Sequence, residues 1–263
     1  NDEELCLKHC RKTGKLLVIM TKHVDDLKIA GETKEEILKV MNMLSEAFGP
    51  VEVDWHDFTN CGVRHIQDPR DLSITLDQCA YIDALKVIEH PSLKSMPSDA
   101  DLTEELFELY RSLLGAAAFA LLTRADVGVF VVALQRMSSK AKVIHTRRLN
   151  VVVRYMQRNH RKICDGRLHG TTALVAVSDS AFKKEDESGH ALKGGLFILA
   201  EAKYRTGEAS RGHLLDYVCS RERHVTRSTF GAELFGACDS ADTAMHLVCL
   251  LHQIKCGSMT PAK

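Results

Sequence analysis

Apolar and polar positions near the start of the chain follow a pattern that predicts a β-hairpin. Two short, branched apolar runs at residues 16–20 and 27–30 flank a polar turn, and the second run ends at Gly31. Runs of this length around a tight turn are typical of two antiparallel strands. The turn holds two adjacent carboxylates, Asp25 and Asp26, and aspartate tolerates turn geometry well.

The pattern then changes to the spacing of an amphipathic helix. Apolar residues recur at intervals of three and four from Ile37 to Phe48, and Gly49 and Pro50 follow, which predicts a helix that ends there. We expect this helix to cover the back of the hairpin's sheet. Short strands are predicted at residues 51–55, 61–66 and 72–76, with a turn at 68–71 and a helical piece at 81–88.

The rest of the chain predicts a helical segment followed by a three-stranded sheet and one long helix. Residues 90–98 are rich in Pro and Ser and favour a linker. We expect two packed helices at 103–122 and 127–137, strands at 173–179, 194–200 and 213–220, a polar loop at 183–193, and a helix at 229–254. One side of that last helix is made of Leu234, Cys238, Ala241, Met245, Val248 and Leu251. This organisation indicates the α+β class.

Composition indicates a globular chain. The 263 residues are 45% hydrophobic, enough for one large or two modest cores. Lysine plus arginine equals aspartate plus glutamate at 35 each, so any nucleic-acid surface has to come from local clustering of charge. The nine cysteines are odd in number and form no CxxC pair, which is typical of a reduced, intracellular protein. Cys6, His9 and Cys10 lack the second ligand pair of a zinc finger or ribbon.

No secretory or membrane segment is expected. The chain opens with the polar run Asn-Asp-Glu-Glu, without the basic and apolar regions of a secretory signal. Residues 113–134 form the most apolar region, but Thr123, Arg124 and Asp126 interrupt it, which suits a helical hairpin better than a bilayer. We therefore expect an intracellular protein, cytoplasmic or nuclear, that is not secreted.

Charge clusters strongly between residues 140 and 167, where nine Lys and Arg residues stand against the single acid Asp165. Helical spacing lines up Arg147, Arg154, Arg158 and Arg161 on one face and allows Val152, Tyr155 and Met156 to face inward. Such a stripe either binds a phosphate backbone, with an affinity that falls as salt rises, or is a solvated helix face. Our candidate nucleic-acid-binding residues are Arg147, Arg148, Arg154, Arg158, Arg161 and Lys162.

The two hairpin carboxylates repel each other. At about 5 Å the repulsion between two carboxylates is roughly 1 to 3 kcal/mol, and a divalent cation would reverse its sign. Magnesium and manganese prefer such hard oxygen ligands, usually one or two carboxylates per ion, with substrate phosphates completing the shell. Asp25 and Asp26 are therefore either metal ligands or the solvated tip of a hairpin.

The residues around this pair resemble a known motif. His23-Val24-Asp25-Asp26, between Leu-Leu-Val-Ile and Leu-Lys-Ile-Ala-Gly, is similar to the aromatic-x-Asp-Asp hairpin of reverse transcriptases, most closely that of copia-type retrotransposons. Stretches similar to further landmarks of that family follow in the same order along nearly the whole chain. These stretches are Cys61-Gly62-Val63, Leu76-Asp77-Gln78, Tyr81-Ile82, residues 110–115 (YRSLLG), 122–126 (LTRAD), 177–181 (VSDSA) and 228–234.

The resemblance implies a fragment of a copia-type Pol polyprotein, namely the C-terminal part of its reverse transcriptase and the N-terminal part of its ribonuclease H. The expected domains are a partial palm with the Asp-Asp hairpin at residues 1–90 and a helical thumb and connection with the basic helix at 91–168. A partial ribonuclease H-like α/β domain is expected at 169–263. By the usual topology of that last fold, its first strand would lack a neighbour and leave an unpaired edge.

The resemblance also implies two metal sites. Asp25 and Asp26 would bind catalytic Mg²⁺ or Mn²⁺ in the polymerase, and Asp179 and Glu233 match the first two acids of the ribonuclease H cage. The family's aromatic residue is His23 here, a departure that bears on template-primer contact and not on the metal ligands. The family's other acids would precede or follow this chain, so we expect both cages to be incomplete in it.

The parent polyprotein would carry out RNA-directed DNA polymerisation and cleavage of RNA in RNA/DNA hybrids, both by two-metal catalysis. Its partners would be an RNA template, a DNA primer, the hybrid and deoxynucleoside triphosphates, without a membrane, in a cytoplasmic virus-like particle or the nucleus. We expect the isolated chain to be inactive. Two other interpretations stay open: a degenerate or repurposed protein that binds nucleic acid without catalysis through the basic helix, and an unstable product with no function.

Overall fold

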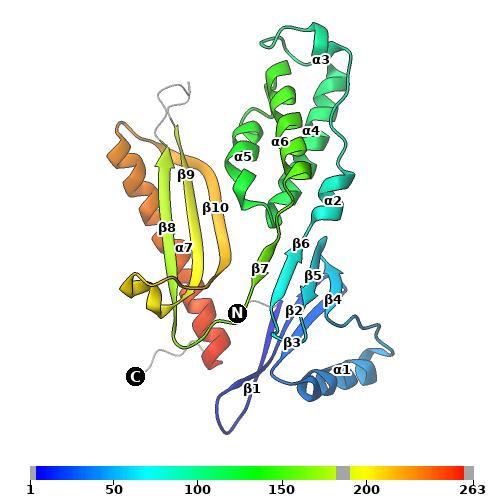
Figure 1. The fold of residues 1–263 in the computed structure, drawn as a ribbon, viewed down its shortest axis with the longest axis vertical. Coiled ribbons are helices and arrows are strands. Elements are labelled where there is room, and N and C mark those ends of the chain that lie inside the picture. Colours follow the sequence, from blue (N-terminus) through cyan, green and yellow to red (C-terminus); the bar gives the residue numbers. More distant parts are fainter. Residues whose placement is uncertain (1–3, 182–189, 258–263) are drawn as a thin grey trace. The chain divides into compact units, whose positions relative to one another are not determined.

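A computed structural model describes residues 4–181 and 190–257 of the chain (Figure 1). The protein is 42% helical and 30% strand, which agrees with the mixed class expected from the sequence. It divides into two compact units, one comprising residues 1–61 and 241–263 and the other residues 62–240. The three-domain division expected from the resemblance, with boundaries at residues 90 and 168, stays a prediction.

The first unit contains the predicted hairpin. Strands β1 (Leu5–His9), β2 (Leu16–His23) and β3 (Asp26–Gly31) form an antiparallel sheet in the order β1-β2-β3. His23 pairs with Asp26, so the turn between β2 and β3 has only two residues, Val24 and Asp25. Val24 has a φ of 55°, in the left-handed region that the tightest hairpin turns use. The predicted hairpin is confirmed.

Helix α1 (Lys34–Phe48) confirms the predicted amphipathic helix. Thr33 caps its start with its hydroxyl, and Gly49, with a φ of 94°, follows its last turn. The helix packs against β2 and β3, and it comes so close that a side chain at Gly31 would clash with Ile37. The half-buried apolar residues on this side are Ile37, Val40, Met41 and Leu44.

The predicted strand at residues 51–55 is wrong. The structure instead has strand β4 (Asp57–Asn60) shortly after it. Val51, Val53 and Trp55 line a cavity beside α1 and are exposed, so this segment borders the cavity without pairing in a sheet. Alternation of apolar and acidic residues predicts an extended backbone, but it does not supply a partner strand.

In the second unit, strands β5 (Val63–Gln67), β6 (Ile74–Asp77) and β7 (Ile163–Asp165) form an antiparallel sheet. β5 and β6 confirm two predicted strands, each displaced by one or two residues. A turn connects them, in which Asp68 accepts hydrogen bonds from the backbone amide and the guanidinium of Arg70. The sequence does not predict β7, because its partner strand β6 lies far earlier in the chain.

Helices α4 (Glu104–Phe119), α5 (Gly128–Gln135) and α6 (Val143–Arg158) pack together in this unit and confirm the expected helices. The 3-10 turns η1 (Ala120–Leu122) and η2 (Ala125–Val127) connect α4 to α5, and the short helices α2 (Cys79–Ala84) and α3 (Ser92–Ser95) precede α4. The helical piece predicted at 81–88 therefore ends early, at residue 84. Fully buried members of the common core include Ile82, Leu106, Tyr110, Leu149 and Met156.

A second antiparallel sheet contains the three strands predicted in the last third of the chain. Strands β8 (Thr172–Ala181), β9 (His190–Glu201) and β10 (Gly212–Val225) have the order β10-β9-β8, and the 3-10 helix η3 (Ala202–Thr206) connects β9 to β10. Within the part of the chain that the structure describes, β8 is an edge strand. Residues 183–189 of the predicted polar loop lie outside that part. Its residues 190–193 belong to β9, so the loop prediction is wrong there, because these residues pair with β10.

Helix α7 (Thr229–Cys256) confirms the predicted long helix, but its buried side is not the one with large apolar residues. Its buried residues are Ala232, Gly236 and Ser240. Its exposed apolar residues include Leu234, Met245 and Val248. A Cβ atom at Gly236 would clash with Ser180 Oγ of β8. Only small residues fit where this helix and the sheet meet.

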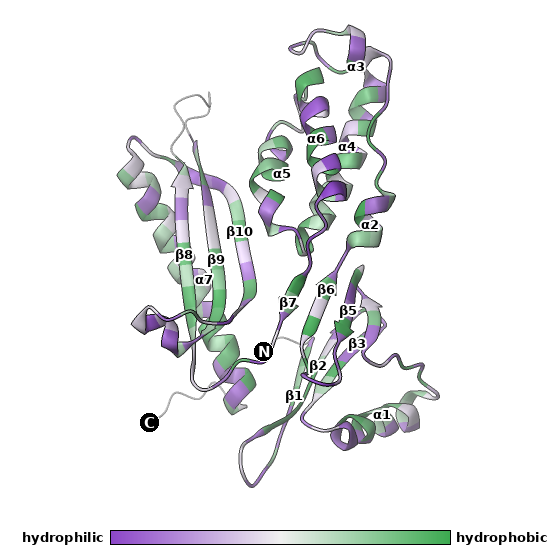
Figure 2. Ribbon diagram, in the orientation of Figure 1, coloured by the Kyte–Doolittle hydropathy of each residue, from purple (hydrophilic) through white to green (hydrophobic). Residues whose placement is uncertain are grey.

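Among the described residues, α7 is also the one helix long and apolar enough to cross a membrane by length and composition (Figure 2). Only 11% of its most apolar 18-residue window is buried. Core helices of proteins without a membrane segment, which are mostly buried, meet the same two criteria. The predicted absence of a membrane partner stays a prediction.

Candidate functional site

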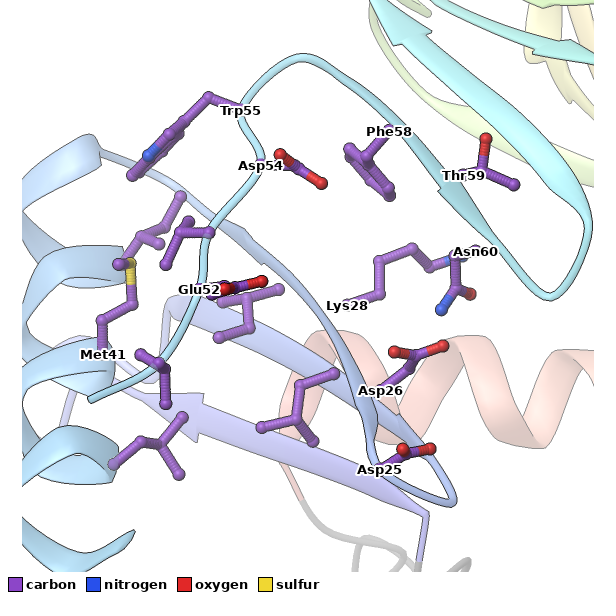
Figure 3. A pocket seen from close by; sticks show the side chains of 16 residues that line it. Asp25, Asp26, Lys28, Met41, Glu52, Asp54, Trp55, Phe58, Thr59 and Asn60 are labelled. Carbon is purple, nitrogen blue, oxygen red and sulfur yellow. The ribbon is translucent and has the colours of Figure 1, made fainter. Parts of the chain in front are cut away.

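The two hairpin carboxylates line one cavity of the first unit (Figure 3). Asp25 is the second residue of the two-residue turn, Asp26 is the first residue of β3, and both are exposed. Adjacent residues of an extended strand point to opposite faces. The turn removes that constraint and lets both carboxylates line the same space.

The cavity measures about 420 Å³ and lies between β3, α1 and the segment that precedes β4. Figure 3 shows two further carboxylates on its lining, Glu52 and Asp54, together with the ammonium-bearing side chain of Lys28. Four acids against one lysine give this lining a negative charge. Sequence reasoning did not single out Glu52 and Asp54, although their alternation with apolar residues was the signal for the strand predicted there.

Aromatic rings form another part of the same lining. Trp55 and Phe58 both border the cavity (Figure 3), and the Nζ atom of Lys34 lies 5.2 Å from the centroid of the Trp55 ring. This distance is within the range of a cation–π interaction. The cavity therefore combines carboxylates with apolar and aromatic surface.

The residue types at the hairpin fit a magnesium or manganese ion. Carboxylate oxygens are the ligands that these ions prefer, and one or two protein carboxylates per ion are usual where substrate phosphates complete the shell. Asp25 and Asp26 match that donor set. No group of three or more His, Cys, Asp or Glu side chains that could hold a metal is found in residues 4–181 and 190–257. Two carboxylates are therefore enough for an ion whose other ligands come from a substrate.

The second pair of candidate ligands lies on β8 and α7. The residue after Asp179, Ser180, faces α7 at Gly236. Since successive strand residues point to opposite faces, Asp179 points to the face away from α7, and it is exposed. Glu233 lies in the first turns of α7 and is half-buried. The strand register does not bring Asp179 next to Glu233, and their shared metal role stays an implication of the resemblance.

Three charged residues that sequence reasoning missed lie on the α7 side of this sheet. Glu222 of β10 is 2% exposed, with a carboxylate oxygen 3.7 Å from the Nζ atom of Lys193 on β9. Lys193 also donates to Asp239 of α7. One lysine thus bridges a buried carboxylate and the helix. The three residues come from distant parts of the chain, so no local pattern marks them.

The candidate nucleic-acid-binding residues divide into those bonded within the protein and those that face solvent. Arg147 belongs to the first group. Its guanidinium donates to the carbonyl oxygens of Leu93 and Met96 at 2.6–3.0 Å and to Ser98 Oγ at 2.7 Å. Arg147 therefore fastens the predicted linker to α6, instead of presenting its charge to a ligand.

Arg161 and Lys162 also pair within the protein. Helix α6 ends at residue 158, so Arg161 does not continue the predicted helical face, and its Nε atom lies 3.6 Å from Asp126. The Nζ atom of Lys162 lies 2.6 Å from Asp77. Burial alone would raise the pKa of Asp77, but hydrogen bonds from Lys162 and a backbone amide outweigh it and bring the pKa to about 2.

The remaining arginines of α6 are exposed: Arg148, Arg154 and Arg158. None of them pairs with a carboxylate in the described part of the chain. Val152 and Met156 are buried as predicted, whereas the predicted inward position of Tyr155 is wrong, because its side chain is 41% exposed. The solvent-facing side of α6 is therefore cationic and partly aromatic.

Comparison with known proteins finds no relative: no family model, no curated protein and no solved structure matches the chain. A functional assignment therefore rests on the residues and geometry of the chain itself.

Proposed function

We propose that the chain is part of a copia-type retrotransposon polyprotein and carries the Asp-Asp hairpin of its reverse transcriptase. One observation carries the proposal: His23-Val24-Asp25-Asp26 spans a two-residue turn between paired strands, and both carboxylates line one cavity. A motif with this geometry supports a metal-binding role more strongly than the same residues on a sequence alone. The collinear landmarks along the chain add support for the family.

In this proposal Asp25 and Asp26 hold Mg²⁺ or Mn²⁺, which when bound activates the primer hydroxyl and stabilises the leaving pyrophosphate. The short turn fixes the two carboxylates relative to each other, so little conformational freedom is lost when a cation binds. The negative lining raises the local concentration of cations. The same negative charge repels nucleotide phosphates until a cation is bound. The cation should therefore bind before the nucleotide.

The proposal extends to the second half of the chain, with Asp179 and Glu233 as acids of a ribonuclease H site that cleaves the RNA strand of a hybrid. The succession of three antiparallel strands and one long helix supports it. The edge position of β8 also supports it, since the implied topology places a further strand there.

Manganese titration of the full chain, followed by electron paramagnetic resonance, tests the hairpin without catalysis. We expect the wild-type chain to bind Mn²⁺ and Asp25→Asn to weaken binding at least tenfold, which is about 1.4 kcal/mol. Asp242→Asn, an exposed acid of α7, is the control and should leave the affinity unchanged. Equal affinities of Asp25→Asn and wild type would remove Asp25 from the proposed role.

Primer extension on an RNA template tests the polymerase activity. For this assay the chain is joined to the preceding palm segment of a copia-type polymerase. We expect extension by the joined wild-type protein and by Asp242→Asn, and none by Asp25→Asn. No extension by the joined wild-type protein would contradict the polymerase assignment.

A second function, nucleic-acid binding without catalysis, is favoured by the unpaired arginines of α6. Exposed guanidinium groups with no carboxylate partner are suited to a phosphate backbone. Salt-sensitive binding that is lost in Arg154→Gln/Arg158→Gln, combined with no turnover under any divalent metal, would favour this function over polymerisation.

A further inference from the structure

The exposed face of α6 carries an aromatic ring among its arginines. Arg148, Val151, Tyr155 and Arg158 are separated by three, four and three residues, so they share one side of the helix. Val151 is 63% and Tyr155 41% exposed. The exposure of Tyr155 changes the chemistry of this face from purely cationic to cationic and aromatic.

We propose that this face binds a single strand of nucleic acid, with an unpaired base stacked on Tyr155 and its phosphates held by the neighbouring arginines. The inference rests on the proposed function, which supplies nucleic acid as the partner, and it names the form of nucleic acid and the residue that selects it. A ring on a helix surface stacks only with a base that is free of its own neighbours, because duplex bases already stack on one another.

The ring of Tyr155 is supported from the protein side. The guanidinium carbon of Arg124 lies 5.8 Å from the ring centroid, and Arg124 is fully buried, so it lies on the inner side of the ring. Two hydrogen bonds to Asp126, at 2.8 and 2.9 Å, and one to the carbonyl of Met156, at 3.1 Å, hold the guanidinium in place. A base on the outer side would complete a stack of guanidinium, phenol and base.

The charges along the helix complement a polyanion. Helix α6 contains no acidic residue. At a rise of about 1.5 Å per residue, Arg158 lies about 4.5 Å and Arg148 about 10.5 Å along the axis from Tyr155. Arg154 precedes Tyr155 directly and is also exposed. Phosphates on both sides of a stacked base therefore come within reach of a guanidinium group.

Fluorescence anisotropy of the full chain with labelled single-stranded DNA, single-stranded RNA and a duplex, at matched salt, tests the inference. We expect Tyr155→Ala to lower the affinity for either single strand about tenfold, which is about 1.4 kcal/mol, and to leave the duplex affinity unchanged. Tyr155→Phe keeps the ring and should keep the single-strand affinity. Tyr155→Trp offers a larger ring and should raise it.

Phe130→Ala is the matched control, since it removes another exposed ring, 57% accessible, from the neighbouring helix α5. It should leave all affinities unchanged. Unchanged single-strand binding in Tyr155→Ala, an equal loss on the duplex, or a loss in Tyr155→Phe as large as in Tyr155→Ala would each overturn the stacking role. A wild-type chain that binds no oligonucleotide would instead contradict nucleic acid as the partner, and the proposed function with it.

Discussion

The side-chain amide of Asn150 satisfies both backbone polar groups of Ile88. Its Nδ2 atom donates to the Ile88 carbonyl, and its Oδ1 atom accepts from the Ile88 amide, both at 2.8 Å. Asn150 is 6% and Ile88 7% exposed, so water does not readily replace these bonds. Asn150 of α6 thereby supplies the two backbone hydrogen bonds that a neighbouring strand would supply in a sheet.

Removal of this amide should be costly. Asn150→Ala leaves a buried donor and a buried acceptor of Ile88 without partners, and we expect the free energy of unfolding to fall by about 2–4 kcal/mol. Urea denaturation measures the change. Asn159→Ala is the control, because the side-chain amide of Asn159 donates to the carbonyl of Tyr155 at the exposed end of α6, and this substitution should cost less than about 1 kcal/mol. Equal effects of the two variants would show that the Ile88 bonds add little.

This contact also explains why the helix after β6 is shorter than its sequence predicts. The apolar pattern at residues 81–88 predicts a helix, yet α2 ends at residue 84, because the backbone that follows finds its hydrogen bonds on α6. In the same way, hydrogen bonds from a distant residue hold the predicted linker, because Arg147 of α6 donates to its backbone carbonyl groups. Local periodicity found the hairpin, α1, α4, α5, α6 and the strands of the last sheet, where neighbouring residues decide the structure.

The contact between α7 and β8 predicts opposite effects for two helical glycines. A methyl group at Gly236 would clash with Ser180 Oγ, whereas nothing lies within 4 Å of a Cβ atom at Gly115 of α4. We expect Gly236→Ala to destabilise by about 1–3 kcal/mol through overpacking. Gly115→Ala should stabilise by about 0.5–1 kcal/mol, because alanine loses less entropy in a helix.

Thermal and urea unfolding of both variants measure these changes. A neutral Gly236→Ala would mean that helix and sheet separate at little cost. The same contact determines which side of α7 is buried. Hydropathy places large apolar residues inward, but close helix–sheet approach at Ser180 admits only small ones.

The pair of Asp77 and Lys162 predicts a loss of stability in acid. The pKa of Asp77 is about 2 in the folded chain, below the unfolded value of about 3.9. Its contribution is therefore present above about pH 4 and is lost as the pH falls towards 2. Since Asp77 is only 7% exposed, we expect a contribution of roughly 2 kcal/mol.

Urea denaturation of wild type and Asp77→Asn at several pH values measures this effect. The gap in stability between them should be largest near neutral pH and should shrink as the pH falls from about 4 to 2. Lys162→Met removes one of the hydrogen bonds that lower the pKa of Asp77. In that background, the difference in stability between Asp77 and Asp77→Asn should change less with pH. A gap between wild type and Asp77→Asn that does not change with pH would contradict the lowered pKa.

The candidate site was predictable only in its local part. Asp25 and Asp26 are neighbours in sequence, so a turn pattern was enough to place both on a hairpin. Glu52 and Asp54 join them on the cavity through the course of the chain after α1, which alternation alone does not fix. For the basic residues, spacing on a helix predicts which ones share a face, but not which ones find a carbonyl or carboxylate within the protein.

Exposed arginines and arginines bonded within the protein should differ in their effect on salt-dependent binding. On a single strand, each phosphate contact contributes about 0.7 to the slope of log affinity against log salt concentration. Arg154→Gln/Arg158→Gln removes two exposed guanidinium groups, so we expect the slope to decrease by up to about 1.4 with little change in stability.

Arg147→Gln should behave in the opposite way, because its guanidinium bonds to the Leu93 and Met96 carbonyls. We expect it to lower the free energy of unfolding by about 1–3 kcal/mol and to leave the slope unchanged. Anisotropy titrations at several salt concentrations, with urea denaturation of the same variants, measure both quantities. A decrease in slope for Arg147→Gln would mean that its bonds to the segment before α4 open when nucleic acid binds.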